Sequence, residues 1–122
     1  MARLTLAQDK VALAVQESVG NYHRDVVEKV ASMVASQKVV VVGMAQNPYV
    51  KRARKLLEEQ GIPFTYLEYG SYVSKWKERL ALKLWAGFPT FPMVFIDGTL
   101  IGGFTDLRAL KDQGKLPKSP AQ

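Results

Sequence analysis

The chain has 122 residues, of which 48% are hydrophobic and 23% charged, and none is cysteine. This length allows one compact domain with a single core and is too short for two. Without cysteine there is no disulfide, no thiolate nucleophile and no iron–sulfur cluster on protein thiolates, and the single histidine, His23, excludes a histidine-rich metal site. No apolar run reaches the roughly 20 residues of a transmembrane helix and no export signal is visible, so we expect a soluble protein outside membranes.

The net charge of +6 is placed unevenly. Residues 1–37 hold four basic and four acidic side chains, whereas residues 38–114 hold eleven basic and seven acidic ones. Such an excess can attract nucleic acid, an anionic surface or a small polyanion. A solvated basic face fits better than a nucleic-acid site, because the chain has no basic stripe interleaved with aromatic residues.

The first 35 residues carry apolar side chains at the three- and four-residue steps of a helix face, namely Val11, Val15, Val19, Tyr22, Val26, Val30 and Val34. Gly20 and Asn21 interrupt this pattern, so that two helices and one kinked helix are both compatible with it. Asp9 is a candidate cap for the first helix, and Asn21 or Asp25 for the second.

The run Val39–Val42, which ends at Gly43, predicts a strand buried on both faces at the centre of a sheet. Asn47 is a favoured helix cap, and the fixed φ of proline suits a first helical position, so we expect a helix over Pro48–Gln60 that stops at Gly61. Its buried stripe is predicted to be Val50, Ala53, Leu56 and Leu57.

The remaining elements follow from the same signals. We expect a strand at Phe64–Glu68, a helix from Ser71 to about Ala86, and a hairpin of Met93–Ile96 and Thr99–Ile101 around the turn Asp97-Gly98. After Gly102-Gly103 we expect a last helix that runs to about Gln113 and stops at Gly114. A strand–helix–strand unit implies a right-handed crossover to a parallel neighbour. The order predicts an α/β protein with the thioredoxin-like fold: a four-stranded mixed sheet flanked by helices, with an N-terminal helical extension.

Separated segments of this chain together resemble a known family: Val39–Gly43, Asn47-Pro48-Tyr49-Val50, Thr90-Phe91-Pro92 and Ile101-Gly102-Gly103-Phe104-Thr105-Asp106. They resemble a glutaredoxin in which Asn-Pro-Tyr-Val stands in place of Cys-Pro-Tyr-Cys. Trp85 and the segment after it are similar to the monothiol branch of that family, and Asn-Pro-Tyr to the dithiol branch. The resemblance implies the thioredoxin-like (glutaredoxin) fold and glutathione-dependent chemistry, with roles in cell redox homeostasis and electron transport in the cytoplasm.

The resemblance places the two lost cysteines at Asn47 and Val50, and it leaves Met44 where many glutaredoxins carry a lysine for the glycyl carboxylate of glutathione. A thiolate at such a position is stabilised by the helix N-terminus. An amide is no nucleophile and valine has no redox chemistry, so Asn47 is expected only to cap its helix. A natural loss fits better than an engineered one, because these replacements change charge, shape and polarity together.

The other glutathione-binding segments of the family are present. The resemblance implies a cis proline at Pro92, backbone contacts from Phe91, and a helix N-terminus with Asp106 for the γ-glutamyl end. The glutathione-binding candidates are Pro48, Tyr49, Thr90, Phe91, Pro92, Gly102, Gly103, Phe104, Thr105 and Asp106. The structural alternative is that Pro92, Gly102 and Gly103 serve only the turn and the close approach of a helix.

Three functions remain open. The first is a protein without catalytic residues that binds glutathione, a γ-glutamyl peptide or a protein partner; the second is an interaction module without ligand. The third is a residual oxidoreductase that uses a thiol of its substrate or of bound glutathione. No metal or resident cofactor is expected, beyond weakly bound glutathione. We expect a helical extension over residues 1–36 packed on the domain, a glutaredoxin-like domain over 37–114 and a flexible tail over 115–122.

Overall fold

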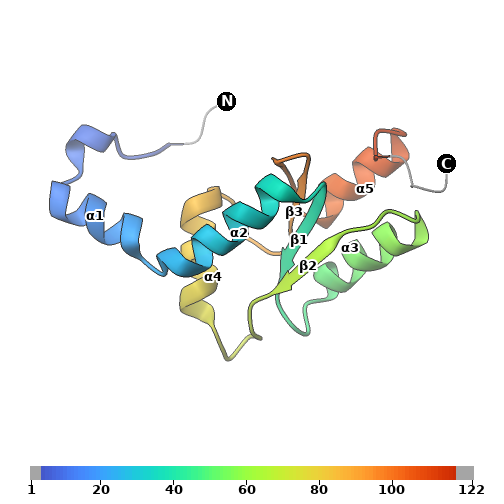
Figure 1. Ribbon diagram of the computed structural model, residues 1–122, viewed down its shortest axis with the longest axis horizontal. Helices are drawn as coiled ribbons and strands as arrows, with labels where there is room; N and C mark the ends of the chain where they lie inside the picture. The colour runs from blue at the N-terminus through green and yellow to red at the C-terminus, as the bar shows by residue number, and fades with distance from the viewer. Residues whose placement is uncertain (1–3, 118–122) are drawn as a thin grey trace.

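The computed structural model describes residues 4–117 (Figure 1). Its elements, in chain order, are the 3-10 turn η1 (Gln8–Lys10), α1 (Leu13–Asn21), α2 (Arg24–Ser36), β1 (Val39–Gly43), α3 (Pro48–Glu59), β2 (Thr65–Glu68), α4 (Trp76–Ala86), β3 (Met93–Ile96), β4 (Thr99–Gly102) and α5 (Phe104–Asp112). Apart from the added turn η1, this is the predicted order of elements. Residues 118–122 of the predicted tail lie outside the described residues.

The four strands form one mixed sheet in the order β2-β1-β3-β4. β1 pairs parallel with β2, with Val41 opposite Tyr66, and antiparallel with β3, with Val41 opposite Val94. All five residues of β1 are buried. The predictions of a central strand and of a parallel neighbour are therefore confirmed.

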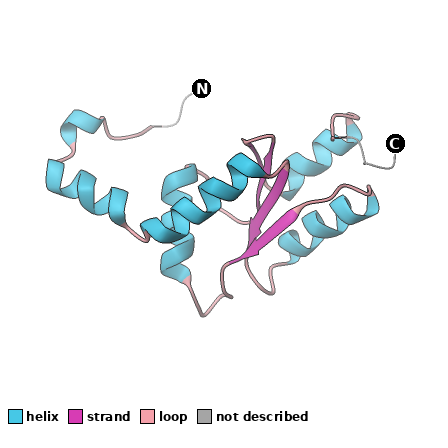
Figure 2. Cartoon of the chain, viewed as in Figure 1, coloured by secondary structure: helices cyan, strands magenta, loops and turns pink. Residues whose placement is uncertain are grey.

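Helices cover both faces of the sheet (Figure 2). Because side chains alternate along a strand, Val40 and Val42 face α2 and α4, whereas Val39 and Val41 face α3 and α5. Three residues of the predicted α3 stripe, Ala53, Leu56 and Leu57, pack with Val39 and Val41. The fourth, Val50, packs on the other face, with Val40 and Val42. Each face of β1 thus has its own apolar core.

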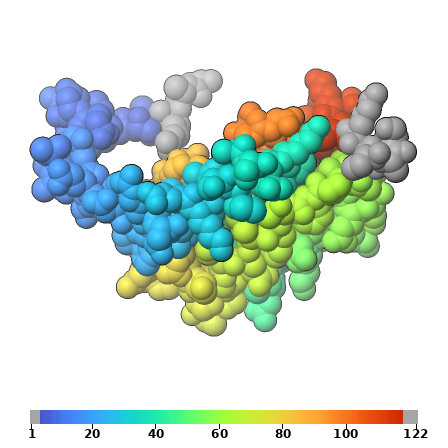
Figure 3. All heavy atoms as spheres, in the orientation of Figure 1, coloured from blue at the N-terminus to red at the C-terminus, as the bar shows by residue number. Residues whose placement is uncertain are grey.

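The N-terminal region consists of two helices, not one kinked helix. The chain turns at Tyr22 and His23, and His23 has φ 45°. α1 contains no buried residue, while α2 buries Val30 and Val34 against the body of the protein. The α1 end of the chain protrudes from the rest in the space-filling view (Figure 3). The predicted division into 1–36, 37–114 and 115–122 stays a prediction.

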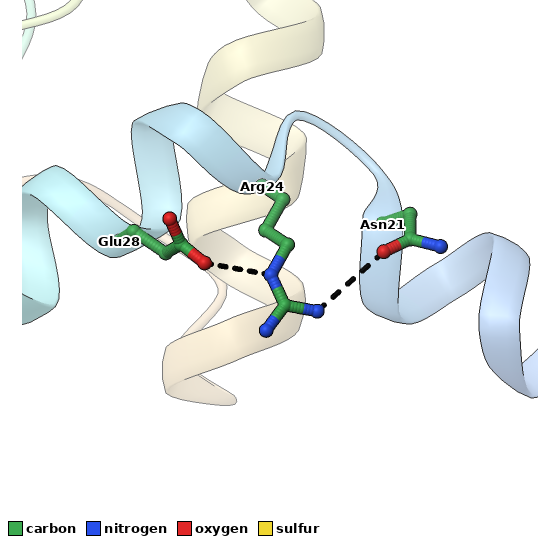
Figure 4. A network of polar contacts seen from close by, with 3 residues as sticks. All are labelled: Asn21, Arg24 and Glu28. Atoms are coloured by element: carbon green, nitrogen blue, oxygen red, sulfur yellow. Dashed lines mark hydrogen bonds and ion pairs between the residues drawn. The ribbon is translucent and has the colours of Figure 1, made fainter.

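The predicted caps of these two helices are wrong. Asp9 lies in η1, and the residues that precede α1 and α2, Ala12 and His23, accept no capping hydrogen bond through their side chains. The Asn21 carboxamide instead accepts a hydrogen bond from Arg24 Nη1 at 3.5 Å, and Arg24 Nε donates to Glu28 at 2.7 Å (Figure 4). Asn21 ends α1, so its side chain serves the connection and not the start of α2.

The helix predicted from Ser71 begins only at Trp76. The Ser71 amide donates to Ser74 Oγ at 3.0 Å, and Lys75 has a left-handed φ of 54°. Serine side chains that bond the local backbone favour a turn over a helix. At the hairpin, Asp97 and Gly98 have φ of 51° and 79°, which confirms the type I′ turn. None of the helices described is both long and apolar enough to span a bilayer.

Candidate functional site

One groove brings together the N-terminus of α3, the segment before β3 and the N-terminus of α5. Its volume is about 620 Å³, within the usual range for small-molecule sites. Ten of the residues singled out from the sequence line it: Asn47, Pro48, Tyr49, Thr90, Phe91, Pro92, Gly103, Phe104, Thr105 and Asp106. The other two, Val50 and Gly102, are buried beside the groove and do not line it.

At the α3 wall, Asn47 caps the helix. Its Oδ1 accepts hydrogen bonds from the amide of Tyr49 at 2.9 Å and from the amide of Val50 at 3.2 Å, with Pro48 at the first helical position. These bonds satisfy two of the amides that have no partner within the helix. The predicted cap is confirmed, and the carboxamide oxygen is turned to its own helix.

The second altered position is part of the core. Val50 is 1% exposed. A Cβ on Gly43 would lie 2.7 Å from Val50 Cγ1, so the glycine that ends β1 makes room for this valine. Met44, where the family resemblance places a lysine, is 7% exposed and belongs to the same core cluster. The α3 wall is therefore held by apolar packing and a cap.

The middle wall is the segment Thr90-Phe91-Pro92, whose Phe91–Pro92 peptide bond is cis, as the resemblance implies. Phe91 is buried, and Thr90 is exposed to the groove that it lines. Lys83 Nζ lies 5.7 Å from the centre of the Phe91 ring, which places a positive charge beside this wall.

The third wall is the start of α5. The amide of Gly103 donates to Asp106 Oδ2 at 3.0 Å, and Gly102 has φ 120°, which favours glycine. An added Cβ on Gly102 would collide with the Asp106 carboxyl group. The first amides of a helix have no carbonyl partner within it, and they carry partial positive charge. The wall thus offers N–H donors next to an exposed carboxylate.

Two basic residues of the groove were missed by the sequence analysis, namely Arg79 and Lys83 of α4. Arg79 is only 7% exposed, and its Nη1 donates to the carbonyl oxygens of Tyr69 and Ser74. Among residues 4–117 it has no carboxylate within ion-pair distance. The signal in the sequence that could have identified Arg79 and Lys83 was their four-residue spacing, which puts both on one helix face next to the buried Leu82.

The groove has no group that could replace a thiolate. Within residues 4–117 no three side chains of the metal-binding types lie close enough together to hold a metal ion. The groove instead combines a capped helix start, a buried arginine and a helix N-terminus with a carboxylate. These groups can bind an ionic peptide, but none of them can form a mixed disulfide.

A four-stranded mixed sheet with helices on both faces, and a groove between a helix start and a cis proline, defines a thioredoxin-like protein. Solved structures agree with this class. A mutated buckwheat glutaredoxin has a TM-score of 0.70 at 28% identity, covering 83% of this chain and 88% of that one. A wheat glutaredoxin has a TM-score of 0.67 at 34% identity, covering 77% of this chain and 87% of that one.

Sequence comparison identifies the family. The profile of the Glutaredoxin family matches residues 39–101. A glutaredoxin-like protein of Dictyostelium discoideum is 50% identical over 102 residues, which cover 84% of this chain and 83% of that protein. Rice Glutaredoxin-C6 is 39% identical over 88 residues, 72% of this chain and 79% of that one. The chain belongs to the glutaredoxin family, and it contains no cysteine.

Proposed function

We propose that this protein binds glutathione, or a peptide with a γ-glutamyl end, without catalysing thiol–disulfide exchange. The observation that carries the proposal is the groove itself, in which the middle wall and the α5 wall remain beside an α3 wall that has lost its thiol. A solved buckwheat relative in complex with glutathione has a TM-score of 0.69 at 28% identity, covering 83% of this chain and 88% of that one.

The α5 wall suits the γ-glutamyl end. The α-carboxylate of that group is an anion for the N–H groups that begin α5, and its ammonium is a partner for the Asp106 carboxylate. Both charges of one amino-acid end are thereby matched within a single turn of helix. This pairing orients the ligand along the groove, with its other end toward α4.

The basic side chains of α4 suit the glycyl carboxylate. A buried guanidinium that donates only to two carbonyl groups is incompletely compensated, which favours an anionic ligand. Lys83 adds a second positive charge, next to Phe91. Arg79 and Lys83 together supply the charge that is missing at Met44.

Binding is expected to be weak, because no mixed disulfide can form. Each charge-assisted hydrogen bond contributes about 1.5 to 3 kcal/mol, and we expect a dissociation constant for reduced glutathione on the order of 1 mM. The thiol should contribute little, so S-methylglutathione should bind about as tightly as glutathione does.

Calorimetric titration with reduced glutathione tests the proposal. Lys83→Ala should weaken binding about tenfold, whereas Lys77→Ala, on the same helix but outside the groove, should leave binding unchanged. Asp106→Ala should abolish what can be measured. Equal effects of the two lysine variants, or binding that needs the free thiol, would contradict the proposed mode.

A protein partner at the same groove is the second candidate. Tyr49, Tyr72 and Trp76 are 52%, 62% and 58% exposed, and the first two line the groove, so that its mouth has aromatic side chains suited to docking. Absence of glutathione binding in the titration would favour this interaction module. Turnover of a disulfide substrate by the unmodified protein would favour the residual oxidoreductase.

A further inference from the structure

A second groove lies between α3 and α5, and Phe104 lines both this groove and the groove described above, which we call the ligand groove. It is lined by Arg52, Lys55, Leu56 and Glu59 of α3 and by Phe104, Arg108 and Lys111 of α5, and we name it the basic groove. Its volume is about 280 Å³. Four of its seven lining residues are cationic and one is anionic, so its walls carry a net charge of +3.

The cations of the basic groove are only partly neutralised from within. Lys55 Nζ lies 3.9 Å from Glu59 Oε1, and both side chains are mostly exposed, so this is a loose surface pair. Arg52 lies over the Tyr49 ring, with Cζ 5.3 Å from its centre, which orients the guanidinium without neutralising it. Within residues 4–117 neither Arg108 nor Lys111 has a carboxylate at ion-pair distance.

The floor of the basic groove is apolar. Leu56 is 8% exposed and Phe104 is half-buried, and both belong to the core between α3, α5 and the sheet. An apolar floor between two cationic walls suits an apolar side chain that is flanked by carboxylates. Arginine binds carboxylates through two parallel hydrogen bonds, which gives such a site direction as well as charge.

We propose that the basic groove docks an acidic segment of a partner protein, with glutamate or aspartate side chains on Arg52, Arg108 and Lys111 and an apolar side chain on the floor. Nucleic acid fits less well. The basic groove has no exposed ring for base stacking, and Glu59 lines it while Glu58 and Asp112 lie exposed on the same helices.

The basic groove lies next to the ligand groove. Phe104 lines both grooves, and Tyr49, on the wall of the ligand groove, contacts Arg52. A segment bound between α3 and α5 therefore lies next to the ligand groove and holds the partner beside it. The proposal does not depend on glutathione binding, because no charge of the basic groove is assigned to that ligand.

The test uses fluorescence anisotropy with a labelled peptide in which glutamates flank one central leucine. The full chain should bind it, and added salt should weaken the binding. Arg52→Glu/Arg108→Glu should reduce affinity about tenfold or more. Lys29→Glu/Lys38→Glu is the matched control, since it makes the same change in net charge at exposed positions outside the basic groove, and it should retain the affinity within about twofold.

The proposal would be overturned if the unmodified chain did not bind the peptide, or if the control variant lost as much peptide affinity as the Arg52/Arg108 variant. It would also be overturned if a peptide with glutamine in place of glutamate bound equally well. Tighter binding of an oligonucleotide of the same charge through the same residues would overturn it as well. Arg52→Gln/Arg108→Gln, which removes the charges without reversing them, should still lose affinity if the reversed variant misfolds. Glutathione titration of the same variants reports on the other groove, so that failure of one proposal is distinguishable from failure of the other.

Discussion

At the α3 wall of the ligand groove, Asn47 caps the helix and Val50 fills the core, so both altered positions serve the fold. At the α5 wall, Asp106 accepts a hydrogen bond from Gly103 and stays exposed, so the same residue serves the fold and remains available to a ligand. The difference shows that a groove of this family can lose its thiols while the backbone of its walls keeps its shape, because helix starts and close approaches are needed by the fold itself.

The largest expected effect comes from returning a thiol to the α3 wall. Asn47→Cys should acquire glutathione-dependent disulfide reductase activity, and the unmodified protein should show none, since a thiol at this helix start would face the groove and have a lowered pKa. The measurement is turnover of a glutathione mixed disulfide. Val50→Cys is the control, because its thiol would be buried and should stay inactive. Reductase activity of the unmodified chain would contradict the view that Asn47 and Val50 serve only the fold.

A second prediction concerns the close approach of Gly102 and Asp106 at the α5 wall. Gly102→Ala should lower the free energy of unfolding by about 1 to 3 kcal/mol, because it forces a side chain into φ 120° and against the Asp106 carboxyl group. Gly114→Ala, at φ 68° with open space around it, should cost less. Urea unfolding measures both, and equal costs would mean that the approach of Asp106 to Gly102 is not constrained.

A third prediction concerns the cap. Asn47→Ala should lower the free energy of unfolding by about 0.5 to 2 kcal/mol, because it leaves the amides of Tyr49 and Val50 without their partner. Asn47→Asp keeps an acceptor and should cost little. If the two variants were equally stable in denaturant melts, Asn47 would have no structural role, and the α3 wall would need another explanation.

The smallest effect is expected behind the α3 wall, where Arg54 lies over Tyr66, with Cζ 4.0 Å from the ring centre. Burial, together with the hydrogen bond to Glu68, raises the pKa of Tyr66 from 10.0 to about 12. The neutral phenol is thus the form that folding favours, so its contribution to stability is present below pH 10 and is lost as the pH rises toward 12. Tyr66→Phe should flatten the pH dependence of unfolding in that window, and Tyr72→Phe, at an exposed position, should not.

The sequence predicted most of the fold because its signals are local. Four consecutive valines marked β1, Asn47-Pro48 marked the start of α3, and Asp97-Gly98 marked the hairpin. The errors arose where side chains had competing partners. Ser71 and Ser74 bond the backbone of a turn, so α4 starts late, and Asn21 serves Arg24 and not the cap of α2.

The site was predicted less completely, because its positive charges come from α4, an element that the family motifs do not include. Arg79 and Lys83 enter the groove from α4, and only the packing of α4 beside the segment before β3 shows that they meet the other walls. Burial also separated residues that the motifs group together: Val50 and Gly102 lie under the groove surface while their neighbours line it.

The central claim, that the groove still binds while its chemistry is gone, is tested most directly by nuclear magnetic resonance titration of the unmodified protein with reduced glutathione. We predict reversible shifts of the amide signals of Phe91, Gly103 and Thr105, which lie on the two retained walls, with a dissociation constant on the order of 1 mM. Amides on the far side, such as that of Asp97, should not shift. No change at Phe91, Gly103 and Thr105 at several times that concentration would contradict the claim.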